Sequence, residues 1–344
     1  MKYRCILLGK HSNRTPMAYK VYHSYFAKHI EYVQRIEDAD FVILGFMENL
    51  NGLHNEINKA LKKNSNLKVV VISEEPLWDT VSGGDFQKKF AQIDFDSSPI
   101  SYINLNHVTS TIFDFDHIPY FLTTNNDMFA RYGLLFSRNR VLSSHTVQQI
   151  WEKYSGKTVF LMQKRLEQLY SVEYPSADIW GLSQLRCEYA LKNQGKKVEI
   201  LGPGWDNQGP RQDLPDWHLD KLRMFDQKTN RMSALENTHI YNYITEKIFD
   251  AFAMCAIPIY YAAKQHKVFS IVESESFINL YGDKINWPIS SLLPLNADTN
   301  FIERYMYTQN LLATLFSNPF YLHLERYRVV QAIITELDQL YIDR

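Results

Sequence analysis

The stretch LENTHIYNYITEKIFDAFAMCAIPIYY, residues 235–261, indicates the fold of this chain most directly. It begins with a polar loop, continues with an amphipathic segment over 243–253, and ends in the apolar run 258–261. This order predicts a loop that feeds a helix, and a helix that returns to a buried strand. Such a unit is typical of proteins in which helices cover a parallel sheet.

The same alternation of short apolar runs and helical patterns extends in both directions from this stretch. The predicted strands are 4–8, 41–45, 68–72, 157–162, 198–201 and 231–236. The predicted helices are 17–32, 52–63, 143–154, 183–193 and a tail over 300–344 with a break at Asn318-Pro319. Residues 77–120 show no regular pattern. The chain therefore has the pattern of an α/β protein with largely parallel sheets.

The predicted strands form two series that join near residue 150. We therefore expect two Rossmann-like domains, residues 1–150 and 151–344, the second carrying the helical tail. Ligands of such sheets bind at the carboxyl ends of strands, and often between domains. The expected architecture is two domains that face each other across a cleft.

Composition excludes several classes of protein. The 344 residues are 45% hydrophobic and 22% charged, with a formal net charge of −1, so no global field draws the chain to nucleic acid or to an anionic membrane. Cys5, Cys187 and Cys255 are isolated and have no zinc-ligand spacing. No run of about 18 apolar residues occurs. We expect a cytoplasmic protein with reduced, buried thiols, and at most peripheral association with a membrane.

Three residues in the first turn of the predicted helix indicate chemistry. Free N–H groups and a partial positive charge make a helix start a favourable seat for phosphate. Thr245 lies at this start, and Lys247 adds a full cation. Glu246 could accept hydrogen bonds from ribose hydroxyls.

The pattern E-N-T-x-x-x-x-Y-x-T-E-K over 236–247, followed by an apolar helix and Ile257-Pro258-Ile259, resembles the signature of the α1,3/α1,4-fucosyltransferases, the family-ten glycosyltransferases. The resemblance implies a GT-B-like fold, GDP-fucose as donor, inversion at the anomeric carbon and no metal or other cofactor. It further implies that Asn237 and Tyr243 bind phosphate or sugar hydroxyls.

Weaker similarities extend the match. Glu275-Ser276-Phe277-Ile278-Asn279 resembles a family segment that follows the donor site. Gln184-Leu185-Arg186 resembles a helix whose arginine faces the donor phosphates; a solvent-exposed helix arginine is the alternative for Arg186. Ser73-Glu74-Glu75-Pro76 resembles the family's turn after a strand, which places the catalytic base at Glu74, with Glu75 as its rival. Leu235, Ala262 and the segment 164–181 depart from the family pattern.

The sequence leaves other functions open. Asp94-Phe95-Asp96 and Asp114-Phe115-Asp116 have the form of the D-x-D motif, which binds a metal and a nucleotide diphosphate in other glycosyltransferases. A different sugar nucleotide, used in surface-polysaccharide synthesis, and a catalytically silent sugar-nucleotide-binding protein are further alternatives. The expected partners are a GDP-sugar and an oligosaccharide or glycolipid acceptor, for which a GlcNAc-type glycan and an α1,3 linkage are favoured. The sequence does not define the oligomeric state.

Overall fold

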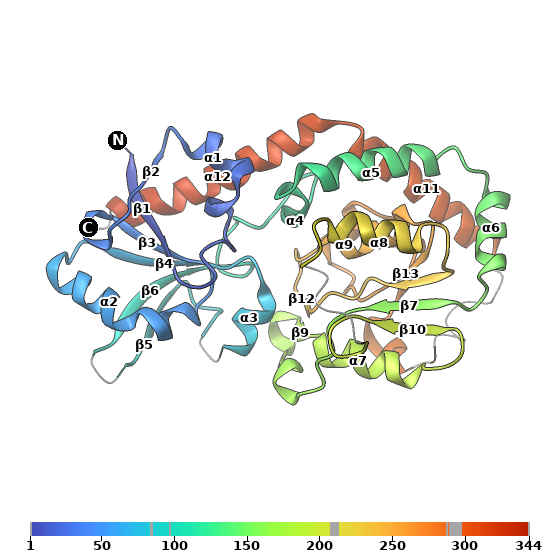
Figure 1. Cartoon of the computed structure of the whole chain (residues 1–344), viewed down its shortest axis with the longest axis horizontal. Helices are drawn as coiled ribbons and strands as arrows, with labels where there is room; N and C mark the ends of the chain where they lie inside the picture. The colour runs from blue at the N-terminus through green and yellow to red at the C-terminus, as the bar shows by residue number, and fades with distance from the viewer. Residues whose placement is uncertain are drawn as a thin grey trace. The chain divides into compact units, whose positions relative to one another are not determined.

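The computed structural model describes residues 2–82, 85–95, 98–206, 213–286, 288 and 298–342. The chain divides into two compact units: Met1–Thr124 together with Phe320–Arg344, and Asn125–Pro319. Each unit contains a sheet of mainly parallel strands with helices packed on it (Figure 1). The prediction of an α/β fold with two Rossmann-like units is confirmed. Their arrangement across a cleft stays a prediction.

The sheet of the first unit has six strands in the order β2-β1-β3-β4-β6-β5. Neighbouring strands pair in parallel, except that β5 pairs antiparallel with β6 at the edge. The strands are β1 (Tyr3–Leu8), β2 (Ile30–Tyr32), β3 (Phe41–Leu44), β4 (Lys68–Ile72), β5 (Phe90–Ile93) and β6 (Ile100–Leu105). The helices and 3-10 turns are η1 (Pro16–Ala18), α1 (Lys20–Phe26), η2 (Ile36–Asp38), α2 (Asn49–Lys63), α3 (Pro76–Val81), α4 (Tyr120–Thr123) and α12 (Pro319–Ile342).

Alternate residues of the central strands face two separate cores. Ile43 of β3 belongs to a buried cluster that includes residues of α12. Its neighbour Val42 belongs to a second cluster, which includes Ile57 of α2. Since successive side chains of a strand point to opposite faces, both faces of this sheet are apolar. Helices cover both, as the burial of a parallel sheet requires.

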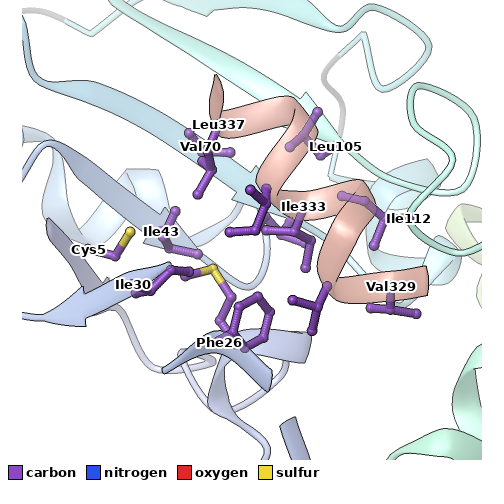
Figure 2. Packing of buried hydrophobic residues seen from close by; sticks show 14 of the residues in the cluster. Cys5, Phe26, Ile30, Ile43, Val70, Leu105, Ile112, Val329, Ile333 and Leu337 are labelled. Carbon is purple, nitrogen blue, oxygen red and sulfur yellow. The ribbon is translucent and has the colours of Figure 1, made fainter. Parts of the chain in front are cut away.

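The C-terminal helix α12 completes the first unit. Figure 2 shows Val329, Ile333 and Leu337 on one side of this helix, packed with strand residues such as Val70 and Leu105. The three helix residues are fully buried. Burial of an aliphatic side chain of this size contributes about 1.5–3 kcal/mol, so this apolar stripe binds the helix firmly to the sheet.

The division of the chain differs from the predicted boundary at residue 150. The helices α5 (Asn126–Asn139) and α6 (Ser144–Lys153) pack with α11 (Thr299–Phe316) in the second unit. The tail, by contrast, splits at Pro319, because the apolar stripe of α12 fills the core of the first unit. An apolar stripe predicts a buried helix face but does not identify the sheet that the helix covers.

Two segments of the first unit differ from their sequence-based description. The predicted helix 17–32 ends at Phe26, and Ile30–Tyr32 forms the strand β2, in which Ile30 pairs with Tyr3. A strand of three residues is too short to show a period of two. The segment 77–120, which has no regular pattern, contains the strands β5 and β6 and all of α3 except Pro76.

The sheet of the second unit has five parallel strands in the order β10-β7-β11-β13-β14. They are β7 (Thr158–Leu161), β10 (Val198–Leu201), β11 (Arg231–Ser233), β13 (Ile257–Tyr260) and β14 (Ile278–Asn279). A small antiparallel sheet consists of β8 (Glu173–Tyr174), β9 (Ile179–Gly181) and β12 (Thr238–His239). The chain steps from β7 outward to β10 and then returns to β11 on the other side of β7, so the connections reverse direction between β7 and β11.

Helices and 3-10 turns surround this second sheet. In addition to α5, α6 and α11, they are α7 (Ser183–Lys192), α8 (Trp217–Phe225), α9 (Glu246–Ala253), η3 (Gln168–Tyr170), η4 (Pro175–Ala177), η6 (Lys267–Ser270) and η7 (Gly282–Asn286). Within the described ranges of the chain, no helix combines the length and the apolar character needed to cross a membrane.

Candidate functional site

The loop that follows β11 lies at the reversal point of the second sheet. Open parallel sheets bind ligands at the carboxyl ends of the two strands that flank such a point, here β7 and β11. This loop, which includes the two-residue strand β12, runs from Ala234 to the start of α9 and contains Asn237, Tyr243 and Thr245. The topology therefore places the sequence motif where a ligand of this sheet is expected.

A buried carboxylate organises the start of α9. Thr245 is the N-cap residue of this helix. Its backbone N–H donates to Glu236 Oε1 at 2.7 Å, and its Oγ1 hydroxyl lies 2.9 Å from both carboxylate oxygens. Lys247 Nζ donates to Glu236 Oε2 at 2.9 Å and to Thr245 Oγ1 at 2.7 Å. The predicted cation does lie at the helix start, but it is paired with a carboxylate of the protein.

The charge of Lys247 is stabilised by its neighbours. Burial lowers the pKa of this lysine, and the carboxylates of Glu236 and Glu246 raise it by more, so its pKa lies above the ordinary value. The side chain remains 23% exposed. A lysine that keeps its charge and part of its exposure can bind an incoming anion.

Glu246 is buried between two lysines. Its Oε1 lies 3.7 Å from Lys247 Nζ and 3.6 Å from Lys221 Nζ. Burial raises the pKa of Glu246, but the two ammonium groups lower it below its ordinary value. The carboxylate is therefore ionised and is a hydrogen-bond acceptor, as its predicted role toward a ribose requires.

A third buried carboxylate, Asp250, lies one turn beyond Glu246 on α9. Asp250 accepts a hydrogen bond from Tyr132 Oη at 2.6 Å and one from His218 Nε2 at 2.8 Å, and it pairs with Lys221. Burial raises its pKa, but Lys221 and His218 outweigh this, and the pKa is lowered to about 2. Lys221 thus links Asp250 to Glu246 and fixes the first two turns of the helix.

Arg186 is buried, so the alternative of a solvent-exposed helix arginine is wrong. Only 6% of the residue is exposed, and burial lowers its pKa. Its Nη1 donates to the carbonyl oxygen of Leu235 at 3.2 Å, while Nε has no hydrogen-bond partner among the described residues. No carboxylate of the described chain forms an ion pair with it. Arg186 is thus a buried cation with unused donors beside the loop after β11.

Asn237 and Tyr243 are both buried in this loop. The carbonyl oxygen of Asn237 accepts from the backbone N–H of Leu182 at 2.9 Å and from Ser183 Oγ at 3.3 Å. These bonds tie the loop to the start of α7, the helix that carries Arg186. The structure therefore brings Arg186 and Asn237 together, although about 50 positions separate them in the sequence.

Two basic residues at the reversal point were missed from the sequence. Lys164 and Arg165 follow shortly after β7, which ends at Leu161, on the other flank of the reversal. The backbone N–H of Arg165 donates to Cys187 Sγ at 3.3 Å, next to Arg186, and the Lys164 ammonium lies 5.1 Å from the centre of the Trp205 ring. Two adjacent basic residues close to the end of the predicted strand 157–162 are the sequence feature that could have identified them.

Glu74 lies in the first unit, where β4 ends. Its side chain is 2% exposed. Glu74 Oε1 accepts from Arg14 Nε and from Tyr19 Oη, each at 2.7 Å, and Oε2 accepts from Tyr120 Oη at 2.7 Å. Burial and the Glu74 charge raise the pKa values of both tyrosines, which keeps them protonated as donors. The carboxylate is thus held in one orientation.

Arg14 joins the two candidate bases. Its Nη2 donates to Glu75 Oε2 at 2.8 Å while its Nε binds Glu74. Burial lowers the pKa of Arg14, but the two carboxylates raise it by more, so the guanidinium stays charged. Glu75 is the more accessible carboxylate, with 16% of its side chain exposed. The sequence drew attention to the acids but not to their partners. Arg14 contacts both acids, and Tyr19 and Tyr120, the latter on α4, contact Glu74.

The metal alternative concerns the two D-x-D triplets. Asp96 of the first triplet lies outside the described residues. Asp116 of the second donates its backbone N–H to Glu325 on α12. In the part of the chain that the structure describes, no group of three or more His, Cys, Asp or Glu side chains is placed to hold a metal ion.

The sequence segment that forms this site matches a known family. Residues 180–307 match the family model described as the C-terminal part of glycosyltransferase family 10 (fucosyltransferase). The matched segment includes Arg186, Glu236 and the start of α9. The chain is therefore a glycosyltransferase. More particularly, it contains a family 10 fucosyltransferase C-terminal domain, which confirms the resemblance inferred from residues 235–261.

Solved structures are similar to the chain at low identity. An alpha1,3-fucosyltransferase is 15% identical, covers 99% of this chain and 92% of its own, and gives a TM-score of 0.46. An alpha1,3-fucosyltransferase with GDP-fucose is 14% identical, and one with GDP is 13% identical; both cover 92% of this chain and 82% of their own, with TM-scores of 0.39 and 0.38. No curated protein matches the chain. The fold assignment rests on the strand order of this chain.

Proposed function

We propose that this chain transfers L-fucose from GDP-fucose to a hydroxyl group of a glycan, with inversion at the anomeric carbon. The observation that carries the proposal is the burial of the Arg186 guanidinium without a directly paired carboxylate. This buried cation has no ion pair among the described residues, and it lies within the segment that matches the fucosyltransferase model. The nearby Glu236 carboxylate acts on Arg186 only at a distance and is already paired with Lys247, so a diphosphate would supply the directly bonded negative charge that Arg186 lacks.

The donor is assigned to the second unit. Arg186 has a planar guanidinium suited to bidentate contact with phosphate oxygens. Lys247 and the start of α9 add positive charge from a second direction. Glu246 is assigned to the ribose hydroxyls, and Asn237 and Tyr243 to phosphate or sugar hydroxyls. These roles follow from the position of each residue in the motif.

Transfer with inversion needs a base for the acceptor hydroxyl, and we assign this role to Glu74. A carboxylate has about four lone-pair positions. Arg14, Tyr19 and Tyr120 use three of them, which leaves one on Oε2 for the acceptor hydroxyl. General-base catalysis typically contributes about 10²–10⁴-fold. The greater exposure of Glu75 makes it the alternative base.

Charge develops on the diphosphate as the sugar leaves. Fixed cations and oriented N–H groups can stabilise that charge without a metal ion. Arg186, Lys247 and the N-terminus of α9 are the groups that would do so, and we propose a metal-independent reaction that uses no other cofactor. Lys164 and Arg165 add positive charge at the same end of the sheet.

The acceptor is proposed from the family resemblance. We assign it as an oligosaccharide or glycolipid with a GlcNAc-type residue, fucosylated in α1,3 linkage during lipopolysaccharide or related glycan synthesis. The three free, buried cysteines support a reducing, cytoplasmic compartment. A fucosyltransferase in that compartment would act on a glycan precursor, at most at the inner face of the membrane.

A ligand screen followed by a transfer assay tests the proposal. Thermal unfolding is measured with the GDP, UDP, CMP and dTDP forms of sugar donors. Ligand at about 100 times Kd should stabilise the protein by roughly 2.7 kcal/mol, and we expect this only for GDP-sugars. Stabilisation by the sugar form of another nucleotide would mean that this nucleotide sugar, and not GDP-fucose, is the donor. Stabilisation by GDP-fucose without transfer to any glycan would favour a silent binding protein.

A further inference from the structure

The groups assigned to the donor phosphate already hold an anion of the protein. Glu236 accepts the backbone N–H and the hydroxyl of Thr245 at the start of α9, and it accepts a hydrogen bond from Lys247 Nζ. An N–H at a helix start together with a lysine ammonium is a typical seat for a phosphate oxygen. The Glu236 carboxylate therefore accepts the hydrogen bonds that a phosphate oxygen bound at this helix start would accept.

Glu236 depends on Lys247 for its charge. Only 3% of Glu236 is exposed. Burial raises its pKa above the ordinary value, and the nearby Glu246 charge raises it further, while Lys247 and the Thr245 N–H oppose them. Arg186 of α7 and Tyr260 of β13 are close enough for the Glu236 charge to raise the pKa of each side chain.

We propose that Glu236 is an internal substitute for the donor diphosphate: the donor takes over Lys247, and Glu236 takes up a proton from solvent as the donor binds. The proposal rests on the donor site assigned above. The proton adds to the carboxylate oxygen that loses Lys247, and it returns to solvent when the nucleotide leaves. No covalent bond other than this O–H bond forms or breaks.

The direction of the proton movement follows from the charges. With the donor absent, Glu236 and Glu246 balance Lys247 and Arg186, while Asp250 balances Lys221 and Arg165 adds one positive charge. The start of α9 is therefore close to neutral. The donor brings about two further negative charges next to Glu236. Like charges at short range favour protonation of a buried carboxylate, and the loss of its ammonium partner acts in the same direction. The Thr245 N–H and hydroxyl can still hold one oxygen of the neutral acid.

Calorimetry detects such proton uptake directly. GDP-fucose is titrated into the enzyme at about pH 7 in buffers of different ionisation enthalpy, and the slope of the observed enthalpy gives the protons bound per donor. GDP-fucose is the probe because its diphosphate carries no group that titrates near neutral pH. We expect uptake that approaches one proton for the wild type and none for Glu236→Gln. Because the neutral amide of this variant no longer competes for Lys247, we also expect the variant to bind about tenfold tighter at alkaline pH. Glu188→Gln, on the exposed side of α7, is the matched control and should behave as the wild type.

The outcomes separate this inference from the proposed function. Binding of GDP-fucose by the wild type without proton uptake overturns the inference alone, whether or not the variant folds. Equal uptake by the wild type and Glu236→Gln also overturns it, because another group would then be the acceptor. If the wild type does not bind GDP-fucose at all, the proposed function fails, and the inference fails with it.

Discussion

Replacing Lys247 with methionine removes one charge from the candidate donor site while keeping most of the side-chain length. The loss of a charge-assisted contact with phosphate should cost about 1.5–3 kcal/mol of donor binding, which weakens the Kd for GDP-fucose roughly 10- to 150-fold. The variant should also be less stable, because Glu236 and Glu246 lose the ammonium group at 2.9 and 3.7 Å. Breaking a fully buried pair costs about 3–5 kcal/mol. Since Lys247 is 23% exposed, we expect a smaller loss, about 2 kcal/mol.

A double variant separates these two effects. In Glu236→Gln/Lys247→Met the buried carboxylate that needed the lysine is gone, so most of the lost stability should return. Donor affinity should stay weak, because the phosphate contact is still missing. Urea unfolding gives the stabilities, and calorimetry gives the Kd. If Lys247→Met leaves both the Kd for GDP-fucose and kcat unchanged, the lysine does not bind the donor.

Four further perturbations test other parts of the account. Glu74→Gln should lower kcat by about 10² or more with little change in donor Kd, and full activity of this variant with an inactive Glu75→Gln would move the base by one residue. Ile333→Ala should destabilise the first unit by about 2–5 kcal/mol in urea unfolding, because Ile333 is fully buried against the sheet; a loss well under about 1 kcal/mol would contradict the packing of α12. Burial raises the pKa of Asp79 to about 8, so its contribution to stability is largest below about pH 4 and falls as pH rises toward 8. Unfolding curves measured over this pH range should show that Asp79→Asn removes the fall in stability. An unchanged pH dependence of stability in the variant would contradict the role of Asp79. Transfer activity should survive EDTA; complete loss restored by Mn²⁺ would point to one of the D-x-D triplets.

Long apolar patterns predicted most of the sheet strands because burial on both faces leaves a clear signal. The run 68–72 became β4, and 41–45 became β3. Short strands such as Ile30–Tyr32 were not predictable, since their pairing with β1 comes from tertiary contacts. The position of α12 was not predictable for a similar reason. Its sequence shows an apolar stripe but not the sheet to which that stripe belongs.

Those parts of the candidate site that depend on neighbouring residues in the sequence were predictable. The helix start at Thr245 and the arginine of α7 followed from motif and pattern. The pairing of Lys247 with Glu236 did not, although both lie in the quoted motif, because the spacing does not show that the loop turns the carboxylate back to the helix. The three donors that hold Glu74 come from distant parts of the chain, including helix α4, and left no local signal.

The most direct test of the central claim is mass spectrometry of glycan acceptors after incubation with the enzyme and GDP-fucose. We predict that an acceptor with a GlcNAc-type residue gains one deoxyhexose for each GDP released, and that Arg186→Ala abolishes both products. If no acceptor gains mass and no GDP is released, while the same enzyme transfers a sugar from another nucleotide, the assignment as a fucosyltransferase is wrong.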